Sequence, residues 1–183
     1  MNRVFLAALL ANLFIIGAVR ADCPPTLMNG KLHGILPVTN QMVTYTDVVD
    51  CGTVSQADLF RRTRLWLTQS FHSSNDTFTL SDKETGDLVG RFTQVVTLPR
   101  SESSAGGVYT FRYSISVECS NRKYRATITQ ITLEETGSTR PSPIETYCQK
   151  NEKDLQVIYS ELDKQLKNTL AALQENVKNY KAF

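Results

Sequence analysis

Three arginines fall in strand-like runs of the sequence at positions that place their side chains on one face of a predicted sheet. Counting alternate positions along each run brings Arg91, Arg112 and Arg125 together. Hydroxyl side chains share this face: Thr93, Thr110, Ser114, Ser116, Thr127 and Thr129. Guanidinium groups among hydroxyls can receive an anionic or sugar-like ligand. The sequence therefore predicts a ligand site at Arg91, Arg112, Ser116 and Arg125, and the alternative is an ordinary solvated sheet face.

Residue sets that are typical of catalysis do not accompany these arginines. Of the two histidines, His33 and His72, neither has a cysteine or carboxylate nearby at metal-ligand spacing. There is no phosphate-binding glycine loop with lysine, no Gly-x-Ser-x-Gly and no zinc-helix motif. Asp82, Glu84 and Asp87 cluster at a predicted hairpin tip, where turn chemistry explains them. We expect no catalytic residue, no metal and no cofactor; a scattered catalytic triad is the weaker alternative.

Four cysteines are spaced widely and irregularly, at positions 23, 51, 119 and 148. Without a Cys-x-x-Cys they do not indicate a zinc or redox site, and spacing alone leaves three pairings open. If the last strand returns beside the first, Cys51 and Cys119 share one end of the sheet, and Cys23 and Cys148 share the other. We predict Cys51–Cys119 and Cys23–Cys148 disulfides. The first requires loops to curl over a strand, because two strand spacings span about 9–10 Å and a disulfide tolerates about 7 Å between Cα atoms.

The strand-like runs are rich in β-branched residues and separated by turn residues. They cover 42–51 and begin again at Phe78, Leu88, Val108 and Lys123. The run 108–119 alternates apolar and polar residues, which is typical of an antiparallel strand with one buried face. A two-residue turn at Ser120-Asn121 would pair Val117 with Tyr124 and Glu118 with Lys123, and would set Arg125 opposite Ser116.

The stretch from Ser55 to Phe71 contains the only tryptophan of the chain, Trp66. Ser55 and Asp58 resemble a capping box, and apolar residues then recur at helical spacing. The apolar positions are Leu59, Phe60, Trp66, Leu67 and Phe71, together with Thr63. We predict a helix whose apolar stripe, including Trp66, lies in the core. The arginines at 61, 62 and 64 are expected on the opposite, solvent-exposed side of this helix.

A second, longer helix is predicted from Ile144 to Tyr180. At about 55 Å it exceeds a strand of eight residues, about 27 Å, so its end should overhang the sheet. The apolar repeat nevertheless continues through Leu170, Leu173, Val177 and Tyr180. The helix can break, fray at its end or pair with another chain. We expect self-association through residues 166–180, because three-and-four spacing suits a helix–helix seam.

The N-terminus has the layout of a secretory signal peptide. Arg3 precedes an apolar run, and Val19 and Ala21 provide small residues for cleavage after Ala21. A membrane anchor, the alternative, needs about 20 apolar residues. Residues 1–21 are therefore predicted to direct a secreted or periplasmic protein, and no later segment could span a membrane. The 20 basic and 18 acidic residues balance too closely to indicate nucleic-acid binding.

The remaining chain is divided into an irregular lead-in (22–40), an α+β domain (41–143) and the long helix (144–183). The order strand, helix, four strands, helix favours a single antiparallel sheet with both helices on one face. The segments "YTDVVDCGTVSQADLFRRTRLWL", "GDLVGRF" and "YTFRYSISVECSNRKYRATITQI" resemble an exported Bacteroidetes-type family of unknown function with a TATA-binding-protein-like (TBP-like) fold. The resemblance implies that fold and supplies no catalytic residues.

Two functions follow as expectations. The first is an exported, non-enzymatic binding module for an unknown protein or a small polar or anionic ligand. The second is a structural or assembly protein that self-associates through its C-terminal helix. Nucleic acid is not expected as a partner, because fold alone does not carry function.

Overall fold

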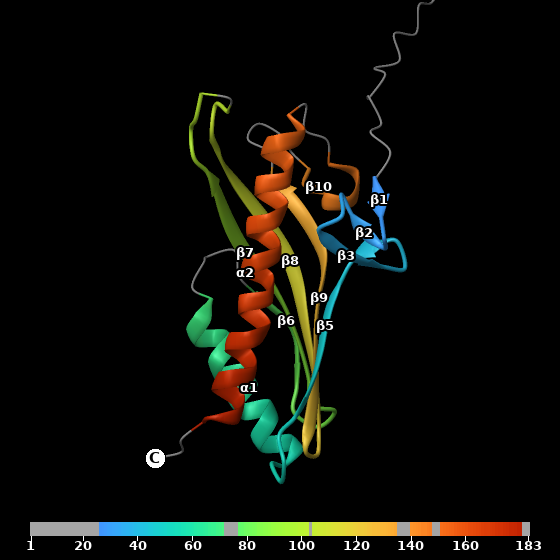
Figure 1. Cartoon of the computed structure of the whole chain (residues 1–183). Coiled ribbons are helices and arrows are strands. Elements are labelled where there is room, and N and C mark those ends of the chain that lie inside the picture. Colours follow the sequence, from blue (N-terminus) through green and yellow to red (C-terminus); the bar gives the residue numbers. More distant parts are fainter. Residues whose placement is uncertain (1–25, 72–76, 103, 135–139, 148–150, 181–183) are drawn as a thin grey trace, which may run out of the picture.

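A computed structural model describes residues 26–71, 77–102, 104–134, 140–147 and 151–180 of the chain. Its main sheet is antiparallel, with the strand order β10–β9–β8–β7–β6. These strands are β6 (Thr77–Asp82), β7 (Asp87–Leu98), β8 (Gly107–Ser120), β9 (Lys123–Glu134) and β10 (Ser142–Pro143). Strand β5 (Tyr45–Asp50) pairs with residues 123–128 of β9 and lies along the same edge as β10. Figure 1 shows the long twisted strands β7, β8 and β9 at the centre of the molecule.

A second, small sheet stands beside the main one, so the prediction of a single sheet is wrong. It has the order β1–β2–β3–β4, formed by Leu27–Met28, Lys31–Leu32, Leu36–Thr39 and Met42–Val43. The Asn and Gly residues that indicated an irregular lead-in instead make tight turns. Asn29, Gly30 and Gly34 have positive φ angles, which short reversals require. Leu32 and Leu36 are fully buried, so this sheet extends the core.

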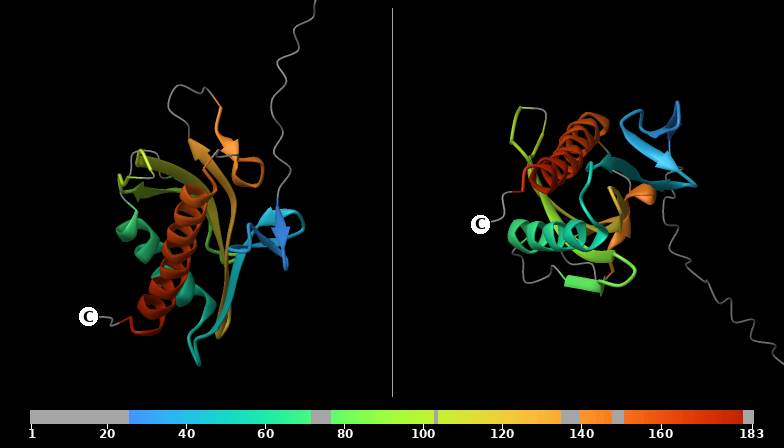
Figure 2. Two further views of the ribbon diagram at one scale, coloured as in Figure 1. Left: turned by 45° about the horizontal axis from the view of Figure 1, so that its top comes forward. Right: turned by 90° about the horizontal axis from the view of Figure 1, so that it is seen from below.

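Both helices cover the same face of the main sheet, as the sequence predicted (Figures 1 and 2). They are α1 (Gln56–Ser70) and α2 (Glu152–Lys178), and a 3-10 turn, η1 (Ile144–Thr146), precedes α2. Large side chains from the strands and α2 fill the space between the layers: Phe92, Phe111, Tyr113, Tyr124 and Tyr159. The opposite face of the sheet carries no helix from the described part of the chain, which leaves it open (Figure 2).

Helix α1 begins as predicted. Ser55 is its N-cap, and the Asp58 amide donates to the Ser55 hydroxyl at 3.3 Å. Leu59, Phe60, Thr63 and Leu67 are buried, whereas Trp66 is only half-buried and packs against the edge of the core. Its ring meets the Phe71 ring edge-on at a centroid distance of 6.0 Å. The stripe is therefore confirmed, but Trp66 lies at its margin.

Helix α2 is shorter than predicted, and its stripe is not exposed. It begins at Glu152 and has 27 residues, about 40 Å. Strands β7–β9 have 12 to 14 residues, also about 40 Å, so sheet and helix match in length. Leu166, Leu170, Leu173 and Val177 are at most 8% exposed. The expected overhang is wrong because the strands are longer than eight residues, and the proposed self-association seam is buried within its own chain.

A hydrogen bond between the two layers fixes α2 over β5. The Tyr45 hydroxyl donates to Asp163 Oδ1 at 2.9 Å, and Lys167 Nζ lies 2.7 Å from Asp163 Oδ2. Burial, followed by the hydrogen bond to Asp163, raises the pKa of Tyr45 well above its ordinary value. The phenol therefore stays protonated and continues to donate to the carboxylate.

The register of the β8–β9 hairpin differs from the prediction. Its turn residues are Asn121 and Arg122, so Glu118 pairs with Arg125 and Cys119 with Tyr124. A shift of two residues keeps every side chain on the same face, so the apolar pattern could not distinguish the two registers. The turn is held by the chain that precedes α1: the Arg122 amide donates to the Val54 carbonyl at 2.9 Å, and the Cys51 amide to the Arg122 carbonyl at 2.6 Å.

The predicted Cys51–Cys119 disulfide is not formed, and both thiols are free. Strand β9 lies between the strands that lead to them, because Tyr124 pairs with Val49 on one side and with Cys119 on the other. Strands two spacings apart are about 9–10 Å from each other, beyond the reach of a disulfide. Cys23 and Cys148 lie outside the described residues, so their pairing stays a prediction.

Candidate functional site

The open sheet face carries all three predicted arginines, but two of them are already paired. Arg125 forms an ion pair with its cross-strand neighbour Glu118, and Arg112 forms one with Glu134. The predicted register had placed Arg125 opposite Ser116, and the shifted hairpin replaces that hydroxyl with a carboxylate. Ser116 instead lies between Val89 and Thr127. The four predicted residues therefore do not form one site.

A hollow of about 370 Å³ gathers two of the predicted residues with new ones. It is lined by Arg91, Arg112, Tyr113, Ser114, Gln130, Thr132 and Pro141. Within the described part of the chain, the Arg91 guanidinium has no hydrogen-bond or ion-pair partner. The Nε of Arg112 is buried and likewise has no acceptor there, although the same guanidinium binds Glu134. The hollow is thus bordered by two donors without acceptors among the described residues, an exposed guanidinium at Arg91 and a buried Nε at Arg112.

A β-bulge in β9 shapes this hollow. Arg112 pairs with Thr132 but Ser114 pairs with Thr129, so β9 carries one extra residue there. Gln130 takes a φ of +55°, and its Oε1 accepts a 2.9 Å hydrogen bond from the Ser114 hydroxyl. Our sequence analysis did not identify Gln130 or Thr132. The signal was present in the sequence, because the apolar residues of this run change from even positions (124, 126, 128) to odd positions (131, 133).

Rows of hydroxyl side chains cross the open face beside the hollow. Thr44 Oγ1 and Thr129 Oγ1 lie 3.5 Å apart, as do Thr46 Oγ1 and Thr127 Oγ1. Ser114 and Arg91 continue the Thr129 row across β8 and β7. Neighbouring strands are about 4.8 Å apart, so successive hydroxyls stand at a regular spacing on the sheet surface.

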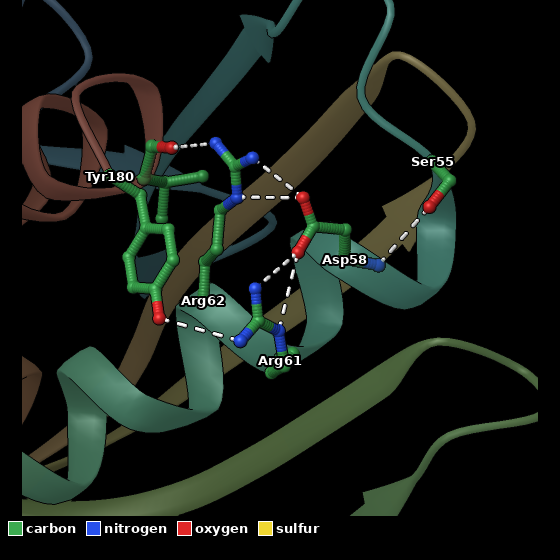
Figure 3. Close-up of polar contacts among 6 residues, drawn as sticks. Ser55, Asp58, Arg61, Arg62 and Tyr180 are labelled. Carbon is green, nitrogen blue, oxygen red and sulfur yellow. Dashed lines mark hydrogen bonds and ion pairs between the residues drawn. The ribbon is translucent and has the colours of Figure 1, made fainter. Parts of the chain in front are cut away.

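Arg61 and Arg64 are exposed on α1, as predicted, whereas Arg62 is not: together with Arg61 it forms a clamp at the end of α2 (Figure 3). Asp58 accepts hydrogen bonds from both Arg61 and Arg62. Arg62, only 15% exposed in its side chain, also donates to the Val177 carbonyl at 3.0 Å. Both guanidinium groups lie 5.1 Å from the Tyr180 ring centroid. Hydrogen bonds from Arg62 and then Arg61 lower the pKa of Asp58, which keeps the carboxylate charged.

A second hollow, of about 830 Å³, follows the outer side of α1 next to this clamp. Phe60 and Leu65 form its apolar part, and Asp58 and Arg61 are already engaged with each other. Arg64 and Lys83 supply its remaining charges. None of the residues predicted as a ligand site lies here.

No three His, Cys, Asp or Glu side chains in the described ranges are grouped so that they could hold a metal ion. Within these ranges, neither helix has the length and apolar character needed to cross a bilayer.

Comparison with known proteins supports the fold. Residues 45–134 match the family described as a domain of unknown function (DUF4468) with TBP-like fold. A TBP-like protein from Parabacteroides distasonis is 16% identical, with a TM-score of 0.64 over 80% of this chain and 99% of that one. A DUF4468 family protein from Bacteroides ovatus is 14% identical, with a TM-score of 0.62 over 79% of this chain and 93% of that one. No curated protein matches the chain.

Proposed function

We propose, from the premise that residues 45–134 are a domain of the DUF4468 family with the TBP-like fold, that this protein is an exported binding module without catalytic activity. Its ligand is a small polar molecule that carries one carboxylate beside hydroxyl groups, as a uronic acid does. The binding surface is the hollow on the open sheet face. Export rests on the signal-peptide layout of residues 1–21.

The observation that carries the proposal is the pair of unsatisfied donors in the hollow. Arg91 is an uncompensated cation, and the buried Nε of Arg112 has no acceptor among the described residues. A buried donor without an acceptor costs about 1–3 kcal/mol, which a bound carboxylate would recover. A carboxylate can accept from two guanidinium groups at once.

The surrounding side chains favour hydroxyl groups on the rest of the ligand. Ser114, Thr132 and the Gln130 carboxamide line the same hollow and can both donate and accept hydrogen bonds. The volume of about 370 Å³ lies within the range of small-ligand sites. A single sugar ring with one carboxylate fits this set of groups.

Charge balance disfavours a strongly anionic ligand. Glu134 and Glu118 neutralise Arg112 and Arg125, which leaves Arg91 as the one uncompensated cation among the three arginines. Nucleic acids and polysulfates need several cations along their length. The ligand is therefore expected to carry one negative charge per binding unit.

The test is calorimetric titration of the mature chain with galacturonate and, separately, with neutral galactose. We expect saturable binding of galacturonate with a dissociation constant on the order of 1 mM. Arg91→Ala should raise that constant by about tenfold or more, because it removes the charged donor. Arg64→Ala is the matched control, since Arg64 is an exposed arginine on α1 outside the hollow.

Three results would overturn the proposal: galactose binding as tightly as galacturonate, Arg91→Ala binding as well as the wild type, or no binding of galacturonate or of glucuronate at 50-fold the expected constant, about 50 mM. A thermal melt of each variant confirms that folding is retained. Because Arg91 is exposed, its replacement should shift stability by no more than about 0.5 kcal/mol.

A further inference from the structure

A third hollow, of about 380 Å³, lies between α1 and α2 above β7. Trp66 and Phe71 form its aromatic side, Gln94 lies on the strand, and Gln165, Asn168 and Thr169 come from α2. In Figure 2 the two helices run side by side over the sheet, so the hollow is on the covered face, opposite the site proposed above.

None of the residues that line this hollow is charged, although 38 of the 183 residues in the chain are Asp, Glu, Lys or Arg. The lining combines aromatic rings, carboxamides and hydroxyls. A charged ligand would lose hydration there without gaining a counter-charge. The hollow therefore selects for a neutral ligand that has both an apolar face and polar edges.

Trp66 supplies the apolar face. Its indole is half-buried, with its ring edge-on to Phe71 at 6.0 Å and Phe71 in turn 4.2 Å from the Phe92 ring. This stack of rings holds the indole against the core while part of its surface stays accessible. A rigid aromatic surface of this kind offers contact area at low entropic cost.

Gln165 supplies a polar group without a partner. Its Nε2 donates to Glu161 Oε1 at 3.0 Å, and because a carboxylate only accepts, the amide orientation is fixed with Oε1 on the other side. That Oε1 is buried and has no donor among the described residues. Because this Oε1 is closed to water, a ligand hydroxyl in the hollow would reach and satisfy it once the side chains around it shift.

We propose that this hollow binds one ring of a neutral saccharide, with the ring face against Trp66 and its hydroxyls bonded to Gln165, Asn168 and Gln94. A pyranose has apolar C–H faces and a rim of hydroxyls that both donate and accept. These features match an indole surface, carboxamides and the free Gln165 Oε1. The absence of charged lining separates this site from the carboxylate site on the open face.

The experiment uses the intrinsic fluorescence of Trp66, which reports on this hollow alone because the chain has one tryptophan. The mature protein is titrated with glucose, galactose, mannose and N-acetylglucosamine, and with galacturonate for comparison. We expect a saturable change for at least one neutral sugar, with a dissociation constant on the order of 1–10 mM. Gln165→Leu should raise that constant about tenfold, because it removes the buried acceptor without emptying the space.

Gln69→Leu is the matched control, an exposed glutamine of α1 outside the lining, and should bind as the wild type does. Arg91→Ala should leave the Trp66 titration unchanged, which separates this site from the one on the open face. If Gln165→Leu fails to fold, Asn168→Ala on the exposed rim provides the second variant. The proposal is overturned by the lack of a saturable signal with all four neutral sugars at about 100 mM, by equal binding of galacturonate, or by wild-type affinity in the folded variant.

Discussion

The two faces of the main sheet are made from the same strands but are held by different interactions. On the covered face, residues such as Phe111, Ile115 and Ile128 are completely buried beneath the helices. On the open face, Val48 and Val95 are exposed, and arginines pair with carboxylates from neighbouring strand positions. One face is stabilised by packing, whereas the other is organised by hydrogen bonds and charge.

The difference shows which properties a sequence pattern determines. Alternation assigns each residue to a face, and a register shift of two residues leaves that assignment intact. Charge pairing across strands depends on the register itself, which the turn and the segment before α1 determine. The residues of the covered face can therefore be predicted without knowing the register, whereas the ion pairs of the open face cannot.

The largest effect should come from the covered face at the end of α2. Leu173→Ala should destabilise the chain by about 2–5 kcal/mol, because Leu173 is fully buried and its truncation leaves a cavity. Urea denaturation at two protein concentrations, tenfold apart, measures the loss. Val157→Ala, on the same helix but 49% exposed, is the control and should change stability by about 0.5 kcal/mol or less.

That experiment also tests whether the stripe of α2 is used within one chain. If it is, the denaturation midpoint of the wild type does not depend on protein concentration. A midpoint that rises with concentration in the wild type but not in Leu173→Ala would mean that the stripe belongs to an interface between chains.

The next largest effect is expected where α1 and α2 meet. Arg62→Ala removes the donor to the Val177 carbonyl and one of the two guanidinium partners of Asp58. We expect a loss of about 1–3 kcal/mol, because the Val177 carbonyl loses this partner. Arg64→Ala, two residues further on and exposed, should cost about 0.5 kcal/mol or less in the same urea denaturation. Equal costs would show that the clamp of Figure 3 contributes nothing to stability.

A smaller, pH-dependent effect should follow from Asp58. Its pKa is lowered by hydrogen bonds from Arg62 and Arg61, so its contribution to stability is present above the unfolded carboxyl pKa and is lost as pH falls through the lower folded value. At pH 7, Asp58→Asn should cost about 1 kcal/mol, and its stability curve should approach that of the wild type as pH falls below the unfolded carboxyl pKa of about 3.9. Thermal melts between pH 2.5 and 7 measure this. Parallel curves over the whole range would contradict the assignment.

Much of the covered face was predictable from the sequence, because burial repeats along each element. The stripe of α1, the apolar side of the strands and the placement of both helices on one face follow from periodicity. Helix α2 was misjudged because its length was compared with strands of eight residues, whereas β8 has 14. The lead-in was misread because Asn and Gly indicate turns without indicating the short strands between them.

The open face was less predictable, since its site depends on two irregularities. The bulge at Gln130 draws Thr132 opposite Arg112, and the turn at Asn121-Arg122 sets Glu118 against Arg125. The turn does not change which face a residue occupies, so alternation alone could not locate it, whereas the bulge reverses the alternation for the residues after Gln130. The parity change in β9 was visible in the sequence, whereas the turn position depends on contacts with residues 51 to 56, which are distant in the chain.

The smallest expected effect has the opposite sign and tests that turn. Arg122 adopts a φ of +75°, a conformation that costs a non-glycine residue about 1 kcal/mol. Its Nε donates to the Gly52 carbonyl at 3.1 Å in an exposed position, so this bond contributes little against solvent. Arg122→Gly should therefore stabilise the chain by about 0.5 kcal/mol, since glycine after asparagine suits a tight hairpin turn.

Arg122→Ala separates the two contributions, because it removes the same side-chain bond and keeps the backbone strain. We expect Arg122→Ala to be slightly destabilised and Arg122→Gly to be more stable than both Arg122→Ala and the wild type in parallel urea denaturations. If the turn were instead at Ser120-Asn121, Arg122 would lie in a strand, and glycine there would destabilise by roughly 0.5–1 kcal/mol. The sign of the change thus decides between the two registers, and with it whether Arg125 faces Glu118 on the open face.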